Sequence, residues 1–222
     1  MPINKGKPPE ELIAAKRRLK STPDTSLNWE GIDKSEKRAI LHSLLNEQGD
    51  LCAYCTRKIS ETDAHVEHLI PQSARTGCDD PDSVDYNNLL AVCDGFEGSA
   101  AGLTCDRARG DAPLTVNPLR SDSLKSIRYQ RDGRIRSDHP EIEYDLNVTL
   151  NLNQEQLVSN RREAVRQLER LLKERGKRRG DQAVRSFCRH YIDQHLANPQ
   201  ERSSYDGVII YFMRRRLHNT NH

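Results

Sequence analysis

Two short stretches specify the fold: Cys52-Ala53-Tyr54-Cys55 and, ten residues further on, His65-Val66-Glu67-His68-Leu69-Ile70-Pro71. The first has C-x2-C spacing, which presents two sulfurs from one tight turn. Cys93 and Cys105 follow later and supply a second pair. Four thiolates from separated segments suit a tetrahedral Zn²⁺ ion, and because they fill every ligand position, the predicted site is structural and not catalytic. The alternative is four buried free cysteines, which are common in protein cores.

The second stretch places a carboxylate beside an imidazole. In an extended strand His65 and Glu67 share one face, and His68 lies on the other. A carboxylate holds a hard cation such as Mg²⁺, and an imidazole with an ordinary pKa of about 6.5 can take a proton from water. The pair therefore predicts metal-assisted phosphodiester hydrolysis. Taken alone, the stretch is better explained by surface histidines beside a glutamate, but its place between the two cysteine pairs favours catalysis.

The sequence predicts helices before this metal-rich centre. Residues 1–49 indicate an N-terminal arm, with a short basic helix over 9–20 and a longer helix after it. The longer helix begins at Asp33 and Glu36, which have capping-box spacing, and stops at Gly49. Residues 50–120 lose the helical period and are rich in Cys, Asp, Asn, Gly and Pro, as in a loop-rich domain held by metals.

The C-terminal half changes character twice. Residues 121–153 predict a connection with a β-hairpin that turns at Asp132-Gly133 and an extended piece over 147–152. From 154 to 222 helical periodicity returns, with a break between Gly176 and Gly180. Basic side chains cluster here, where they could contact backbone phosphates or an acidic partner, or simply be solvated helix ends. These are Lys177, Arg178, Arg179, Arg214, Arg215 and Arg216.

Composition limits the class of protein. The chain has 222 residues, 35% of them hydrophobic and 31% charged, which suits one domain with extensions and a modest core. The net charge is only +2, but residues 151–222 hold 15 Lys and Arg against 8 Asp and Glu, and residues 1–150 hold 20 against 25. A basic region beside an acidic centre suits a protein that touches phosphates and holds cations, but taken alone the bias is better explained by solvated helix faces.

The sequence also indicates where the protein resides. No apolar stretch approaches the ~20 residues of a membrane span, and residues 1–9 lack the apolar core of a secretory signal. We therefore expect a cytoplasmic protein with no membrane partner. In a reducing compartment six cysteines favour metal ligands or free thiols over disulfides. Cys78 and Cys188 have no partner pattern, and we expect ordinary thiols.

The order of these motifs resembles the zinc-containing HNH nucleases. The family pattern runs C-x2-C, Asp/Glu-His-Ile-x-Pro, Asn-Leu-x-x-Leu-Cys and Cys-His-x-x-Lys. The matching segments here are Cys52-x2-Cys55, Glu67-His68-Leu69-Ile70-Pro71, Asn88-Leu89-Leu90-Ala91-Val92-Cys93 and Cys105-Asp106-Arg107-Ala108-Arg109. The resemblance implies an α+β fold, in which a small zinc-stabilised ββα-metal core and a β-hairpin are flanked by N-terminal and C-terminal helices. It also implies an endonuclease that hydrolyses DNA with Mg²⁺ or Mn²⁺.

The resemblance assigns roles position by position. His68 falls on the general base, Glu67 on the first metal ligand, and Asn88 on the asparagine that orients the base and its loop, with Asn87 as its rival. Asp106 falls on the last metal ligand, where HNH proteins at large have His or Asn. His65 has no fixed role in the family and could contact a phosphate or a neighbouring side chain. The eleven residues between the second pair of cysteines exceed the usual two.

A closer resemblance covers nearly the whole chain. The segments that carry it are similar to PtuB-type HNH proteins of bacterial retron and Septu anti-phage systems: Trp29, residues 44–55, Glu67 to Ser73, the Cys105-Asp106 pair and Asn117-Pro118-Leu119. This resemblance implies a partner, the ABC/SMC-like ATPase PtuA, which restrains or directs the nuclease. A retron reverse transcriptase with its RNA–DNA hybrid is a further implied partner. The implied target is DNA of phage or host, with RNA or tRNA left open.

Two other functions compete with this hypothesis. A non-catalytic zinc adaptor for nucleic acid or for the ATPase would keep the four cysteines and leave Glu67, His68 and Asp106 as surface residues. A conventional restriction or homing nuclease is less favoured, because the sequence has no recognisable target-recognition domain such as a helix-turn-helix. The acid, base and amide at family positions favour the defence nuclease.

Overall fold

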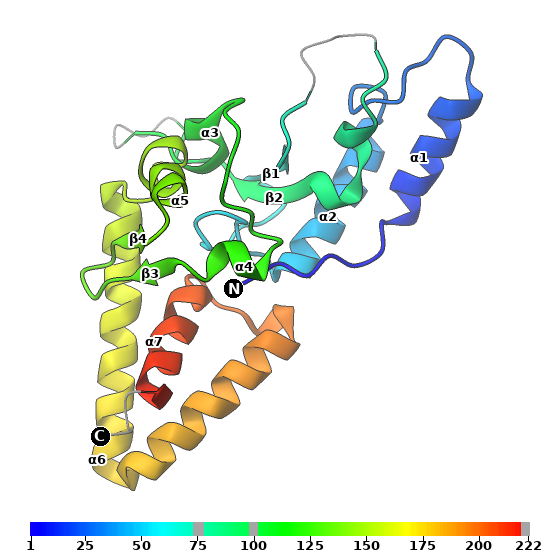
Figure 1. Ribbon diagram of the computed structural model, residues 1–222. Helices are drawn as coiled ribbons and strands as arrows, with labels where there is room; N and C mark the ends of the chain where they lie inside the picture. The colour runs from blue at the N-terminus through cyan, green and yellow to red at the C-terminus, as the bar shows by residue number, and fades with distance from the viewer. Residues whose placement is uncertain (73–77, 98–101, 219–222) are drawn as a thin grey trace.

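The computed structural model describes residues 1–72, 78–97 and 102–218, and it has the expected α+β class (Figure 1). A pair of N-terminal helices lies on one side of a small central sheet, and a long helical hairpin extends away on the other. The strands of the described ranges form two separate two-stranded sheets, β1-β2 and β3-β4. No helix in those ranges is both long and apolar enough to cross a bilayer.

The N-terminal helices are α1 (Glu10–Ser21) and α2 (Lys34–Gln48). The predicted capping box at the start of α2 is confirmed, since the Asp33 amide donates to Glu36 Oε2 at 2.8 Å. The helix ends at Gly49, as predicted, with a left-handed φ of 65°. A Cβ at Gly49 would lie 2.0 Å from the carbonyl oxygen of Pro199, so the close approach of the C-terminal region also requires glycine.

The central sheet pairs β1 (Ala64–His68) with β2 (Leu89–Cys93) in antiparallel register, with Glu67 opposite Leu90. All five residues of β2 are buried. The Gln48 side chain attaches α2 to β2, because its amide donates to the Ala91 carbonyl at 2.8 Å and accepts from the Ala91 amide at 2.8 Å. A buried amide paired in this way fixes the depth at which the helix sits on the sheet.

Short turns and a short helix complete this centre. The 3-10 turns η1 (Pro81–Val84) and η2 (Tyr86–Asn88) lead into β2. After β2 the chain reaches α3 (Cys105–Arg109), which packs against β2 and starts at a cysteine. The central segment therefore runs strand, strand, helix in chain order.

The predicted hairpin is present. After α4 (Ser121–Leu124), β3 (Ile127–Tyr129) and β4 (Ile135–Ser137) pair in antiparallel register around the expected turn. Gly133 has a φ of 92°, and a Cβ there would lie 2.1 Å from the Val158 carbonyl. The buried Arg161 guanidinium donates to the Gly133 carbonyl at 2.6 Å, which ties the hairpin to the long C-terminal helix.

The extended piece expected over residues 147–152 is wrong. The helix α5 (Pro140–Tyr144) continues as the π-helical turn η3 (Asp145–Thr149). The Asp145 carboxylate accepts from the amides of Thr115 and Val116 at 2.6 and 2.8 Å, which anchors this turn on the preceding loop. Leu146 and Leu150 are both buried, and at i,i+4 spacing a helical turn places them on one face.

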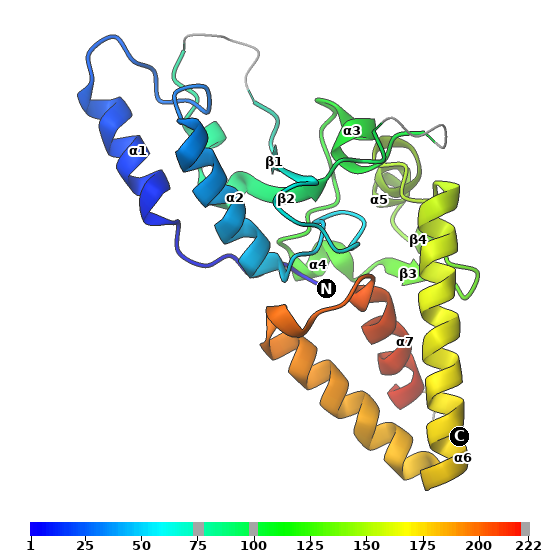
Figure 2. The same cartoon turned by 180° about the vertical axis from the view of Figure 1, so that it is seen from behind.

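The C-terminal region consists of α6 (Glu155–Ala197), η4 (Pro199–Glu201) and α7 (Asp206–His218). The predicted break is confirmed at Gly180, where φ is 77° and ψ is 173°. There α6 reverses into two arms, and α7 lies between them (Figures 1 and 2). The buried Asp206 carboxylate accepts from Tyr191 at 2.5 Å and bonds His195 at 2.6 Å, which links α7 to the second arm.

Candidate active site

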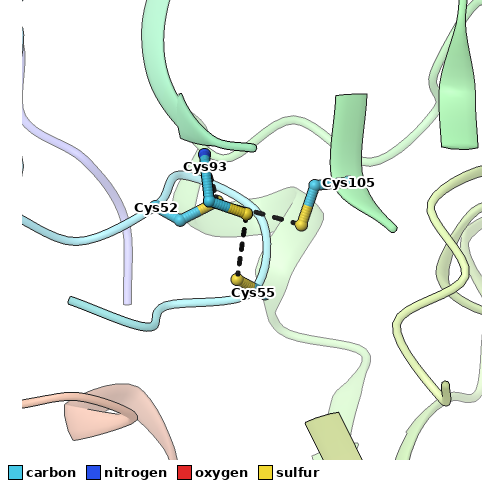
Figure 3. Close-up of side chains that lie close together, drawn as sticks. All are labelled: Cys52, Cys55, Cys93 and Cys105. Atoms are coloured by element: carbon cyan, nitrogen blue, oxygen red, sulfur yellow. Dashed lines mark hydrogen bonds between the residues drawn. The ribbon is translucent and has the colours of Figure 1, made fainter. Parts of the chain in front are cut away.

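The four predicted zinc ligands come together in the interior. Cys52 and Cys55 lie on the loop after α2, Cys93 ends β2 and Cys105 begins α3, and their sulfurs point toward one another (Figure 3). The Cys52–Cys105 and Cys55–Cys93 sulfurs are 3.9 and 3.8 Å apart, and all four lie within 4.8 Å of one another. A tetrahedron with Zn–S bonds of about 2.3 Å has edges of about 3.8 Å. The cluster therefore fits a Zn²⁺ ion.

Backbone geometry holds these ligands in place. The knuckle turns through the Thr56 amide, which donates to the Cys52 carbonyl at 3.0 Å, and the Cys93 amide donates to the Cys52 sulfur at 3.4 Å. The long gap before Cys105 is closed at its base, because the Thr104 amide donates to the Gly95 carbonyl at 2.9 Å. Cys93 and Cys105 are therefore adjacent in space despite their unusual spacing in sequence.

Crowding of the thiols also favours a cation. Hydrogen bonds among the sulfurs, led by the one with Cys105, lower the pKa of Cys93 far below its ordinary value. The bond with Cys52 is the main cause that raises the pKa of Cys105 well above its ordinary value. The Cys93 sulfur is therefore easily ionised, whereas the Cys105 sulfur is not. A bound metal ion would allow all four cysteines to be thiolates.

A cavity of about 310 Å³ opens where β1 ends beside α3. The structure brings the predicted general base, His68, and the two predicted metal ligands, Glu67 and Asp106, to its wall. The other lining residues are Pro71, Gln72, Arg107, Gly110 and Asp111. Two carboxyl groups and an imidazole therefore face one space large enough for a phosphate group.

Glu67 is buried and held by several donors. Its Oε1 accepts from Tyr54 Oη at 3.0 Å and forms an ion pair with Arg109, and its Oε2 accepts from the His68 amide at 3.0 Å. Burial, followed by the nearby Asp106 carboxylate, nevertheless raises the pKa of Glu67 to about 7. A divalent cation would stabilise the ionised form of a carboxyl group whose pKa is raised by burial and by a neighbouring carboxylate.

Asp106 is paired with His65. Its Oδ2 lies 2.6 Å from His65 Nε2, a contact that joins the first turn of α3 to β1. Burial opposes ionisation of Asp106, but the hydrogen bonds with His65 and Glu67, together with the charges of His65 and Arg107, outweigh burial, and the pKa of Asp106 is lowered. Asp106 is therefore a carboxylate at neutral pH, and His65 orients it.

The His68 ring is held in one orientation. Its Nε2 lies 2.9 Å from the Ser83 carbonyl, and because a carbonyl only accepts, Nε2 carries the hydrogen and Nδ1 keeps the lone pair. The edge of the ring meets Trp29 with ring centroids 5.1 Å apart. Burial lowers the pKa of His68, so the imidazole is neutral at pH 7. A neutral imidazole with a lone pair on Nδ1 is competent as a general base.

The two candidate asparagines differ in their contacts. Asn88 Oδ1 accepts from the Ile70 amide at 2.6 Å, and its Nδ2 donates to the carbonyls of Ile70 and Asp82 at 3.1 and 2.9 Å. The exposed Asn87 bonds Asp85. Asn88 thus holds the loop that leaves β1 and does not line the cavity.

The basic C-terminal residues are not brought to the cavity. Lys177, Arg178 and Arg179 lie at the turn of α6, at the far end of the helical hairpin from β1 (Figures 1 and 2). The end of α7 lies beside this turn, because Arg216 pairs with Asp181 at 2.6 Å. These side chains form a separate basic region.

Three residues that contact Glu67 or His68 have no role in the sequence motifs: Arg109, Tyr54 and Trp29. Arg109 was noted only as the last position of the Cys-x3-basic motif, yet its guanidinium reaches Glu67 and the carbonyls of His68 and Leu69. Tyr54 lies inside the cysteine knuckle and donates to Glu67. Trp29 is far away in sequence, and nothing local to it indicates a contact with the His68 ring.

Comparison with known proteins gives one distant relationship. No family model matches the chain. The chain is 26% identical over 185 residues to a protein of Vibrio cholerae serotype O1 biovar El Tor named "Retron Vc95 putative HNH endonuclease". The likeness covers 78% of this chain and 86% of the Vibrio protein. It supports an HNH-type relationship and, at a coarse level, a nuclease.

Proposed function

We propose that this chain is a metal-dependent HNH endonuclease that hydrolyses phosphodiester bonds of DNA. In this proposal β1, β2 and α3 are the ββα-metal unit, and the zinc on the four cysteines is structural. The observation that carries it is the convergence of Glu67, His68 and Asp106 on one cavity, with the His68 ring fixed so that Nδ1 holds the lone pair.

The acidic residues fit a hard divalent cation. Asp106 is ionised, and Glu67 offers Oε2, which accepts one backbone amide and has lone-pair capacity left. Oxygen ligands of this kind suit Mg²⁺ or Mn²⁺. When bound, the ion would supply positive charge at the scissile phosphate and at the leaving oxygen. His65 keeps Asp106 directed toward the cavity.

His68 performs the proton transfer. Its Nδ1 accepts a proton from a water molecule as the water oxygen attacks phosphorus. The resulting imidazolium is stabilised by the Ser83 carbonyl, which already accepts from Nε2. The bond between phosphorus and the 3′ oxygen breaks as the bond to the water oxygen forms, and the leaving 3′ oxygen takes a proton from solvent, so the products carry a 5′-phosphate and a 3′-hydroxyl. Asn88 fixes the loop after β1 and so positions His68.

The biological setting is part of the proposal. The Vibrio relative is named as a retron protein, and the PtuB-type motifs indicate anti-phage defence in the bacterial cytoplasm. The proposed partners are a PtuA-like ABC/SMC-type ATPase and a retron reverse transcriptase with its RNA–DNA hybrid. The basic region at the α6 turn and the end of α7 is proposed to contact phosphates or an acidic partner.

Plasmid nicking tests the function. Supercoiled DNA is incubated with the zinc-loaded protein and Mg²⁺ or Mn²⁺, alone and with the ATPase. Wild type is expected to nick. His68→Ala is expected to lose about 10²- to 10⁴-fold in rate, the usual contribution of a general base, and Asp106→Ala is expected to lose activity because it removes a ligand of the proposed cation. His139→Ala, which removes an exposed histidine immediately before α5, serves as the control and keeps activity. Equal inertness of all four proteins in both conditions would end the proposal.

A second candidate is a non-catalytic zinc adaptor for nucleic acid or the ATPase. The observation that favours it is the ion pair of Glu67 with Arg109, which already gives the carboxylate a cationic partner. An adaptor predicts that nucleic-acid or ATPase binding survives in all variants while no variant, nor wild type, nicks DNA.

A further inference from the structure

A second hollow of about 560 Å³ lies against β1 on the side of α2. Its apolar wall is formed by the Trp29 indole together with Leu41, Ala64 and Val66. Lys37 and Arg38, both on α2, supply two cationic side chains at the same hollow. An aromatic face next to cations is the arrangement that proteins use to hold a nucleobase and its phosphate.

Trp29 is fixed by the segment that also fixes the candidate base. The Trp29 amide donates to Ser83 Oγ at 3.0 Å, and the Ser83 carbonyl bonds His68 Nε2 at 2.9 Å. The indole and imidazole rings meet edge to face at 81°. The Trp29 indole, which lines the hollow, is therefore held next to the His68 imidazole, which lines the cavity.

The cations of the hollow differ in how firmly they are held. Arg38 pairs with Glu61 at 3.0 Å, but its side chain is 78% exposed. The Lys37 ammonium lies 5.2 Å from the centre of the Trp29 ring. Because lysine has a flexible four-carbon stem, this ammonium can move from the ring to a phosphate when a base covers the indole.

The hollow and the cavity of the candidate active site are neighbours along β1. His65 lines the hollow, and its ring bonds Asp106, which lines the cavity. The N-terminal part of β1 borders the hollow and its C-terminal end borders the cavity, and three residues of strand span about 10 Å. A nucleic-acid strand with one phosphate in the cavity would thus bring a neighbouring nucleotide to Trp29.

We propose that this hollow binds an unpaired nucleobase of the substrate strand, stacked on Trp29, with Lys37 on the adjoining phosphate. The inference rests on the proposed function for the position of the scissile phosphate. A base inside a duplex has both faces covered by its neighbours, whereas an unpaired base can stack on an indole. The substrate class is therefore single-stranded or locally unpaired nucleic acid.

The single tryptophan of the chain makes a direct assay possible, because all tryptophan emission comes from Trp29. The zinc-loaded protein, without Mg²⁺ or Mn²⁺, is titrated with a short labelled single-stranded DNA and with the duplex of the same sequence. Label anisotropy measures binding and tryptophan emission measures stacking. We expect the single strand to quench emission and the duplex to leave it nearly unchanged at equal occupancy. Unchanged emission at saturating single strand, equal quenching by duplex, or no binding of single strand would overturn the inference.

Variants separate stacking from folding. Trp29→Leu should weaken single-strand binding about tenfold or more, as expected for loss of one stacked base, and Trp29→Phe should restore most of it. Tyr144→Leu removes an aromatic side chain that is 60% exposed on α5 and should bind like wild type. Equal affinity of Trp29→Leu and Tyr144→Leu, with zinc content and circular dichroism unchanged, would contradict the proposal.

The binding assay is independent of cleavage. If wild type shows quenching by single strand but never nicks DNA when Mg²⁺ or Mn²⁺ is added, the endonuclease function fails and the base site stands. If it nicks DNA and shows no quenching, the base site fails and the endonuclease function stands.

Discussion

Replacement of Arg109 by methionine should destabilise the fold strongly, because this cation is almost fully buried. Arg109 is 5% exposed. Besides its ion pair with Glu67, it donates to the carbonyls of His68, Leu69 and Ala112 at 2.9, 2.8 and 2.7 Å. Removal of one partner of a buried ion pair costs about 3–5 kcal/mol. That loss is a large share of the ~5–15 kcal/mol by which domains are stable.

The same substitution should be pH-dependent, and the sign follows from Glu67. Burial raises the pKa of Glu67 from 4.5 to about 7 in the fold. A carboxyl group of this kind stabilises the fold below its unfolded pKa, and that contribution is lost as pH rises through the folded pKa. Without Arg109 the pKa of Glu67 rises further. The free energy of unfolding that Arg109→Met loses relative to wild type should therefore grow between pH 6 and pH 8.

Urea denaturation of the zinc-saturated proteins measures both effects. Arg109→Met combined with Glu67→Gln should recover part of the loss, because the buried charge is then absent. Arg131→Met is the control, since its ion pair with Glu169 is exposed and is expected to contribute less than about 1 kcal/mol. A deficit for Arg109→Met no larger than that of Arg131→Met, or no recovery in the double variant, would refute the assignment of Arg109 as the buried counter-ion of Glu67.

Three further outcomes are expected. Chelation of zinc, or Cys93→Ser, should unfold the central segment, because apparent zinc affinities of about 10–16 kcal/mol rival the whole stability of a domain. Metal release and circular dichroism measure this unfolding. Retained structure would argue against a fold that depends on zinc. Mn²⁺ binding by calorimetry should weaken as pH falls below about 7, where Glu67 is protonated, and stay constant above it, whereas a pH-independent affinity would exclude Glu67 as a ligand. Gly49→Ala should lower the free energy of unfolding by over about 2 kcal/mol, because its left-handed φ alone costs ~1–2 kcal/mol and its Cβ would also meet the Pro199 carbonyl at 2.0 Å. Thermal unfolding measures the loss. The control is Gly102→Ala, which has no atom within 4 Å of its Cβ and should lose only the backbone strain.

The sequence alone predicts that the four cysteines cluster and that Glu67, His68 and Asp106 lie together, because both groups belong to short motifs. C-x2-C specifies one turn, and a Glu-His pair at a strand end specifies neighbouring side chains. The proximity of Cys93 and Cys105 is harder to predict, because it depends on the hydrogen bond between Thr104 and Gly95. A gap length in sequence does not report such a contact.

Other features depend on tertiary packing that no local pattern encodes. The roles of Arg109 and Trp29 arise from contacts with residues about 40 positions away. The extended piece expected near Asn147 failed because Asp145 binds the backbone of Thr115 and Val116, which anchors a helical turn. Alternating polarity in a short segment cannot reveal that kind of anchor.

The central claim is that Glu67 and Asp106 hold a catalytic cation in front of His68. Crystals of the zinc-loaded protein soaked in Mn²⁺ test it directly, because anomalous scattering locates manganese independently of zinc. We predict a manganese peak in the cavity, within about 2.0–2.6 Å of a carboxylate oxygen from each residue, that is absent from Asp106→Ala. A cavity without manganese at saturating concentration, with the zinc site filled, would contradict the account.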